Sequence, residues 1–232
     1  MKGFTLIELS IVLVIISLVV GGIVGGKSLI KSAEINQFAQ DLKIYSSAAL
    51  TFSDQYDYYP GDIPNAQEYW PQCADEVGVT CNGNGNNRID LADERFRVME
   101  HLSLSGIIDH QYKYEDGADS SQYFYKSKIK NWNVRGTIEY TENVYTKQGH
   151  IMYLPAFSNS MPVSSIAGMD KKIDDGKASS GNFLSLFYTL HIIFGYTSCT
   201  NPGIPLGNLA TVTTSNYVLS EKNASCVMVY RL

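Results

Sequence analysis

An almost unbroken apolar segment begins the chain and limits the folds that the chain can adopt. Residues 9–23 carry no charge, and together with the apolar residues before Glu8 they are about long enough to cross a bilayer as a helix. A secretory signal peptide is the alternative interpretation. Against it, Lys2 is the only positively charged residue before the segment, and no small-residue cleavage site follows the segment. We therefore expect a membrane-spanning helix over about residues 4–26.

The helix is predicted to continue well beyond the membrane. Apolar residues recur there at steps of three and four, which places them on one helical face: Ile35, Phe38, Leu42, Tyr45, Ala49, Phe52 and Tyr56. Pro60 and Gly61 mark the end of the pattern. We predict one helix over residues 4–57. Its second half packs on the protein's own sheet, and the apolar surface of its first half is available to neighbouring subunits.

Residues 58–232 are predicted to form one head domain of the α+β class. Tyr, Thr, Ser, Asn and Gly crowd the region after Tyr112, a composition typical of strands and turns. One helix should contain residues 100–102 and another should run from near Pro162 to Asp175. An antiparallel sheet laid across the long helix is expected from strands at residues 122–126, 134–140, 151–155, 184–193 and 226–232.

The four cysteines fall into two local pairs, Cys73 with Cys81 and Cys199 with Cys226. A chain that enters a membrane exposes its head to an oxidising compartment, which favours disulfides. Free thiols or metal ligands are the alternative, yet the chain lacks CxxC spacing and paired histidines. The pairing is inferred from proximity in the sequence.

The residues that lead into the apolar segment read Lys-Gly-Phe-Thr-Leu-Ile-Glu over positions 2–8. This stretch resembles the prepilin family, the type IV pilins and the pseudopilins of type II secretion, whose members have a short basic leader that ends in Gly. The resemblance implies a pilin-like fold with residues 1–3 as the leader. It also implies cleavage after Gly3, N-methylation of Phe4, and control of assembly by Glu8 together with Thr5.

A carboxylate at membrane depth needs a physical explanation. Insertion scales put its cost at roughly 2.5–3.5 kcal/mol, so Glu8 is expected to have a partner. Cleavage would create an amino group on Phe4, and that group on an adjacent subunit could neutralise Glu8. The competing interpretation is that Glu8 extends to the lipid headgroups without a partner.

The resemblance implies partners and a location. The partners are a prepilin peptidase that also acts as N-methylase, other pilin or pseudopilin subunits, and the inner-membrane assembly platform. The chain would cross the bacterial inner membrane once, with a periplasmic carboxy-terminal domain, before it joins a pilus or pseudopilus. The net charge of −5 argues against a broad basic face, so no nucleic acid partner is expected for the head alone.

Two segments are candidate calcium sites. One follows the spacing of an EF-hand loop, with side chains or a backbone carbonyl from Asn82, Asn84, Asn86, Arg88, Asp90 and Asp93. Its first half lacks acidic residues, so a turn cluster without an ion is the competing interpretation. The other is Asp170, Asp174 and Asp175, in a region where the resemblance to pseudopilins implies calcium in a carboxy-terminal loop.

Enzymatic activity is not expected. The four histidines are scattered and no GxSxG-type nucleophile motif occurs. The sequence therefore predicts a structural subunit of a type IV pilus or type II secretion pseudopilus. The alternative is a minor pilin that acts as a calcium-dependent binding, adhesion or DNA-uptake module.

Overall fold

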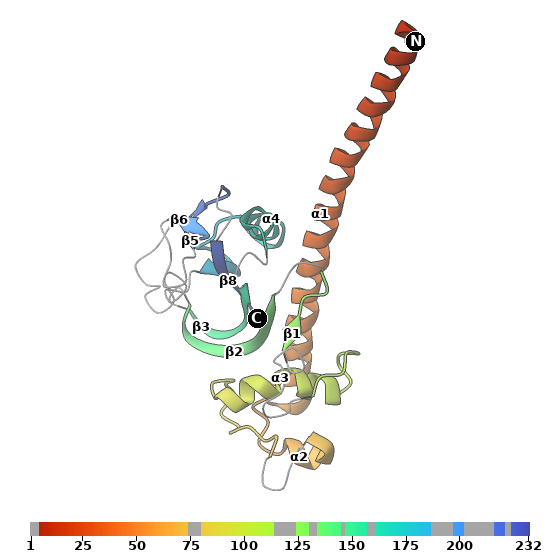
Figure 1. Cartoon of the computed structure of the whole chain (residues 1–232). Coiled ribbons are helices and arrows are strands. Elements are labelled where there is room, and N and C mark those ends of the chain that lie inside the picture. The colour runs from red at the N-terminus through yellow and green to blue at the C-terminus, as the bar shows by residue number, and fades with distance from the viewer. Residues whose placement is uncertain are drawn as a thin grey trace.

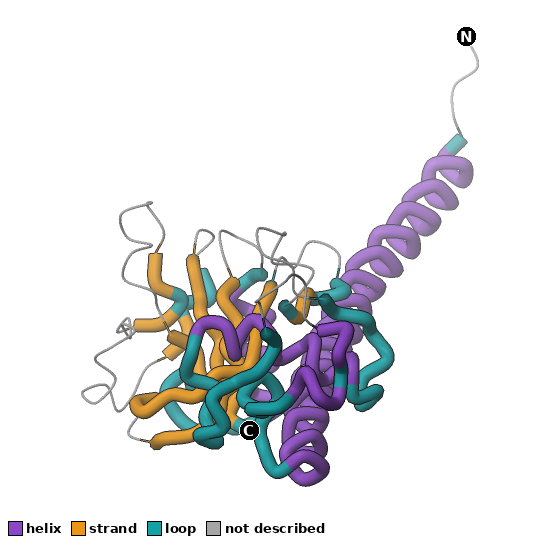
Figure 2. The backbone as a smooth tube through the Cα atoms, turned by 90° about the horizontal axis from the view of Figure 1, so that it is seen from below, coloured by secondary structure: helices purple, strands orange, loops and turns teal. Residues whose placement is uncertain are grey.

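The computed structural model describes residues 5–73, 80–113, 124–129, 134–144, 147–156, 161–186, 197–201, 216–220 and 224–232. It shows one very long helix, α1 (Leu6–Tyr56), and a head of helices and strands beside the second half of α1 (Figure 1). The first half of α1 stands clear of the head in both ribbon views (Figure 2). The α+β, pilin-like fold class predicted from the sequence is confirmed.

Local capping defines both ends of α1. Thr5 has an extended backbone and caps the first turn, so the helix begins close to the predicted position. Asp57 adopts a left-handed conformation with φ 61°, and its N–H donates to the Ser53 carbonyl oxygen. The helix therefore ends before Pro60, at a left-handed cap rather than at the proline.

The head contains three further α-helices, one 3₁₀ helix and eight strands within the described residues. The helices are α2 (Ala66–Tyr69), η1 (Pro71–Cys73), α3 (Ala92–Leu104) and α4 (Val163–Ile173). The strands are β1 (Tyr125–Lys126), β2 (Arg135–Val144), β3 (Lys147–Ala156), β4 (Phe183–Leu186), β5 (Thr197–Ser198), β6 (Thr200–Asn201), β7 (Asn216–Tyr217) and β8 (Ala224–Arg231).

The main sheet has the strand order β1-β2-β3-β8-β4, and all of these neighbours are antiparallel. Pairs such as Ile138 with Met152 and Met152 with Tyr230 fix the register of its centre. Strand β5 adds a short parallel pairing with β8, which the sequence did not predict. Strands β6 and β7 form a separate antiparallel pair.

A single hydrophobic core joins α1 to the head. Five members of the predicted apolar stripe are buried, and the two at its ends are partly buried against the core. Tyr125 of β1 packs edge-on against Phe38 and Tyr45 of α1, while α3 and α4 also contact α1. Because one face of α1 is fixed in this way, the orientation of its protruding half is set by the head.

Candidate functional site

The first turn of α1 holds its own acidic residue. The Thr5 backbone N–H and hydroxyl donate to Glu8 Oε2 at 2.7 and 2.8 Å, and the Glu8 N–H donates to Thr5 Oγ1 at 3.4 Å. This reciprocal arrangement is a capping box. It holds the Glu8 carboxylate at the amino-terminal end of the helix, where the helix dipole favours negative charge.

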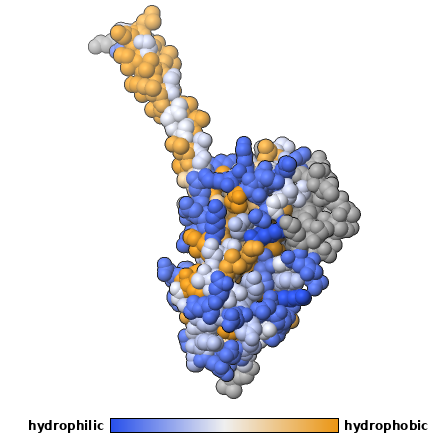
Figure 3. Space-filling model, turned by 180° about the vertical axis from the view of Figure 1, so that it is seen from behind, coloured by the Kyte–Doolittle hydropathy of each residue, from blue (hydrophilic) through white to orange (hydrophobic). Residues whose placement is uncertain are grey.

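The protruding half of α1 is apolar around its whole circumference. Large apolar side chains from Leu6 to Ile30 have exposed fractions above 50%, and Figure 3 shows them covering the rod beyond the head. Among the described residues, α1 is the one helix with the length and composition to cross a membrane. A surface of this kind needs lipid or other helices around it, because exposure of so much apolar surface to water is unfavourable.

The predicted processing residues, Gly3 and Phe4, lie outside the described residues. The structure brings Thr5 and Glu8 together one turn after them. A family model for the prokaryotic N-terminal methylation motif matches residues 1–24. The chain carries the signature of type IV pilins and pseudopilins. Comparisons with curated proteins and with solved structures find no match.

The motif supports a precursor of the type IV pilin or pseudopilin type. Its match ends at residue 24, so the head is interpreted from its own geometry. The membrane-capable α1 that begins inside the motif fits a membrane-anchored pilin. The matched motif and the membrane-capable segment therefore both fall in α1.

Two disulfides close loops of the head. Cys73 is bonded to Cys81, and Cys199 is bonded to Cys226. Arg97 Nη1 of α3 donates to the Cys73 carbonyl oxygen at 3.0 Å, and His101 Nε2 lies 3.1 Å from the Cys81 carbonyl oxygen. One helix therefore holds both ends of the first disulfide loop.

The two buried histidines in the described residues form hydrogen bonds with the backbone of the head. His101 Nδ1 accepts a hydrogen bond from the Gly61 N–H, and His150 Nε2 accepts one from the Ile89 N–H. Burial lowers the pKa of His101 to about 3 and that of His150 to about 4, so both rings are neutral at pH 7. His110 is exposed and packs edge-on against Tyr112, and His191 lies outside the described residues.

The asparagine-rich loop brings together only part of the predicted calcium set. Asn84 Nδ2 and Asn86 Nδ2 donate to the two carboxylate oxygens of Asp90 at 3.5 and 3.1 Å. Asn82 turns towards α2, where its Oδ1 accepts from the Gln67 N–H, so it does not join them. The loop thus departs from the EF-hand arrangement that its spacing predicts.

The side chains of Arg88 and Asp93 have other surroundings. The Arg88 guanidinium lies 3.5 Å from Glu142 and over the Tyr140 ring, whereas the Arg88 backbone N–H stays with the loop and donates to Asn86 Oδ1 at 2.8 Å. Asp93 is exposed in the first turn of α3. Its neighbour Glu94 turns towards the loop instead, because that position lets its carboxylate accept the free N–H groups at the start of α3.

Sequence reasoning missed two carboxylates beneath this loop, Asp62 and Glu94. Asp62 Oδ1 accepts from the N–H groups of Gly85 and Asn86 at 2.8 and 3.2 Å. Burial and the nearby Glu94 charge raise the pKa of Asp62 to about 6. Gly83 lies against this backbone, since a Cβ there would come within 2.4 Å of Asp62 Cα. Gly83 and Gly85 could therefore have indicated from the sequence that another part of the chain lies close to this loop.

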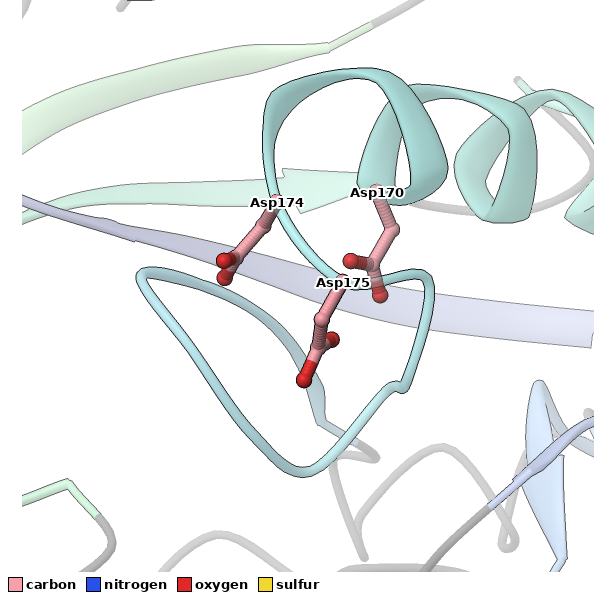
Figure 4. A group of neighbouring side chains, drawn as sticks. All are labelled: Asp170, Asp174 and Asp175. Atoms are coloured by element: carbon pink, nitrogen blue, oxygen red, sulfur yellow. The ribbon is translucent and has the colours of Figure 1, made fainter.

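The second predicted set, Asp170, Asp174 and Asp175, does gather at the end of α4 (Figure 4). One oxygen from each lies within 4.8 Å of the others. Groups from the loop after α4 and from two strands already bond these oxygens: Tyr217 of β7 and the Gly176 N–H donate to Asp170, the N–H groups of Asn182 and of Phe183 in β4 donate to Asp174, and Ser180 donates to Asp175. These bonds connect the end of α4 to its following loop and to strands β4 and β7.

Proposed function

We propose that this chain is a structural subunit that is cleaved after Gly3 and assembles through α1 into a type IV pilus or a type II secretion pseudopilus. The observation that carries the proposal is the contrast along α1. Its first half is apolar on all sides and exposed, and it begins with the single acidic residue Glu8. Such a rod is suited to pass from a bilayer into a bundle of identical rods.

Apolar contact alone does not decide how these rods pair. Lipid tails are as apolar as Leu and Ile side chains, so transfer from lipid to a helix bundle brings little hydrophobic gain. Packing and polar contacts then determine the partner and its axial position. Glu8 is the residue in the first turns of α1 with the charge to do this.

The capping box gives Glu8 a partner before assembly. In the single chain, Thr5 supplies a backbone N–H and a hydroxyl to one carboxylate oxygen. These neutral donors reduce the cost of the charge at membrane depth but do not cancel it. The amino group that cleavage creates on Phe4 of a neighbouring subunit supplies the missing positive charge. Processing and assembly are linked because that amine forms only after Gly3 is removed.

Assembly through α1 also implies the partners and the location of the chain. The partners are the prepilin peptidase and N-methylase, other subunits and the inner-membrane assembly platform, and the head faces the periplasm before it reaches the filament. The two described buried histidines act as hydrogen-bond acceptors inside the head, which supports a structural rather than a catalytic role.

The test replaces Glu8 by Ala and, separately, by Gln, with Ser10→Ala as the matched control on the same exposed segment. We expect all three proteins to be cleaved, as measured by the mass of the mature chain. Incorporation of both Glu8 variants into sheared filaments should fall at least about a hundredfold, because loss of one partner of a buried pair costs about 3–5 kcal/mol. Incorporation of E8A at the wild-type level would overturn the proposal.

A further inference from the structure

Two buried carboxylates lie beneath the asparagine-rich loop of residues 82–91. Asp62 is fully buried, and Glu94 is 2% exposed. The ion pairs found among the described residues join Arg88 to Glu142, Arg95 to Glu139 and Arg97 to Glu100. Within that part of the chain, neither Asp62 nor Glu94 has a basic partner, which is unusual for buried carboxylates.

The two carboxylates differ in how fully they are satisfied. Glu94 Oε1 accepts from the Asn84 N–H, and its Oε2 accepts from the Asp90 and Leu91 N–H groups, each at 3.0 Å. Asp62 uses Oδ1 in the same way, and the Asn87 N–H also approaches its carboxylate, whereas the buried Oδ2 accepts no hydrogen bond of normal geometry within the described chain. A buried carboxylate oxygen without a donor is costly, so it calls for a ligand.

The Asp62 carboxylate faces the polar side chains of the loop. The Asn86 N–H is shared by Asp62 Oδ1 at 3.2 Å and Asn84 Oδ1 at 2.9 Å. Two acceptors of one N–H must lie on the same side of it, so the Asp62 and Asn84 oxygens are neighbours. Asn84 in turn contacts Asp90 through its amide nitrogen. Asp62, Asn84 and Asp90 thus form one cluster that reaches from the core to the surface.

The chemistry of this cluster selects its ligand. It offers two carboxylates and a carboxamide oxygen, and a carboxamide oxygen that accepts one N–H keeps a second lone pair. Flexible, mixed oxygen donors of this kind suit Ca²⁺, whereas Zn²⁺ favours sulfur and nitrogen ligands. We propose that Asp62, Asn84 and Asp90 bind a calcium-class divalent cation, with water completing its coordination.

A cation there stabilises the junction between the two parts of the head. Next to Asp90, the Ile89 carbonyl oxygen accepts from the Tyr140 N–H of β2 at 2.7 Å, and the Ile89 N–H donates to His150 of β3. Glu94 ties the same loop to the start of α3. The bound ion therefore fixes α3 and the sheet to one another, and the stability of the head depends on calcium.

The experiment measures the melting temperature of the full-length chain in detergent after removal of metal with EDTA, and again with about 1 mM CaCl₂, a concentration at which extracellular calcium modules are occupied. Calorimetric titration with CaCl₂ gives the stoichiometry. The variants are D62N and D90N, with D175N as the matched control in the other acidic cluster. Because Asp90 is exposed, D90N retains the fold even if D62N does not.

We expect calcium to raise the melting temperature of the wild type and of D175N, with one ion bound per chain. D62N and D90N should lose that shift. An unchanged wild-type melting temperature at 1 mM calcium would overturn the proposal. So would a shift that D90N retains or that D175N loses, because the ion would then lie elsewhere. None of these outcomes depends on filament assembly, so the two proposals are tested separately.

Discussion

The two halves of α1 share one continuous helix but have opposite surroundings. In the first half, side chains such as Leu13 are 62% exposed on an apolar rod, while in the second half Leu42 is fully buried in the hydrophobic core shared with the head. The second half has a buried apolar stripe and mostly polar residues elsewhere, apart from the exposed Ile44 and Leu50. The first half exposes large apolar side chains along its whole length. A helix needs only a stripe to pack on its own domain.

The difference shows what each half requires. The second half finds its partners within the chain, so its packing contributes to the stability of the head. The first half has none in the described structure, so its apolar surface serves contacts with lipid and with other copies of the chain. Substitution of a leucine should therefore affect the stability of the head in the second half of α1 but not in the first.

The largest contrast is expected between L42A and L13A. Removal of the buried Leu42 side chain leaves a cavity and should lower the free energy of unfolding of the head by about 3 kcal/mol. Hydrogen exchange of the full-length chain in detergent should then be about a hundredfold faster over residues 38–52. L13A should leave exchange of the head unchanged. Equal effects of the two substitutions would mean that the halves are not independent.

Acid should remove the contribution of His150 to the stability of the head, and the first half of α1 contains no histidine. The unfolded pKa of His150 is about 6.5, and its folded pKa is lowered to about 4. Between these values only the unfolded chain binds the proton, so the contribution of His150 is complete above pH 6.5 and is lost as the pH falls towards 4.

The measurement is the unfolding free energy of the head between pH 7 and pH 4 for the wild type, H150Q and the exposed control H110Q. Because Gln does not titrate, H150Q should lose less stability than the wild type over this range, and H110Q should follow the wild type. A wild-type slope in H150Q would show that another group controls the acid response.

The smallest effect is expected where the two halves meet. Lys31 Nζ donates to Ser164 Oγ of α4 at 2.7 Å, just before the buried stripe begins. K31A should cost about 1 kcal/mol and speed hydrogen exchange in α4 about fivefold. The neighbouring K27A, at an exposed position, is the control. If K31A has no effect on α4, the head is held to α1 by the core alone.

Much of the fold follows from local sequence patterns. The apolar spacing predicted α1 almost to the residue, and the alternating segments predicted the long strands β2, β3 and β8. Strand β4 starts near its predicted position, but residues 187–193 of the same prediction lie outside the described residues, as do residues 122 and 123 before β1. Strands β5, β6 and β7 were missed because two residues cannot establish a period.

The proposed calcium site of Asp62, Asn84 and Asp90 shows where predictions from local patterns fail. The EF-hand spacing grouped Asn84, Asn86 and Asp90, and their side chains do contact one another in one loop, because neighbours in sequence stay neighbours in space. It could not find Asp62, which lies about twenty residues earlier and reaches the loop only through the tertiary fold. It also chose Asp93 instead of Glu94, since a spacing rule does not register which residue the first turn of α3 directs at the loop.

The most direct test of the central claim is the mass of the amino-terminal peptide of chains recovered from assembled filaments. The proposed function predicts that residues 1–3 are absent and that the chain begins with N-methylated Phe4. Filament-derived chains that still carry Met1, Lys2 and Gly3 would contradict it, because Glu8 would then have been accommodated in the filament without the amine that cleavage creates.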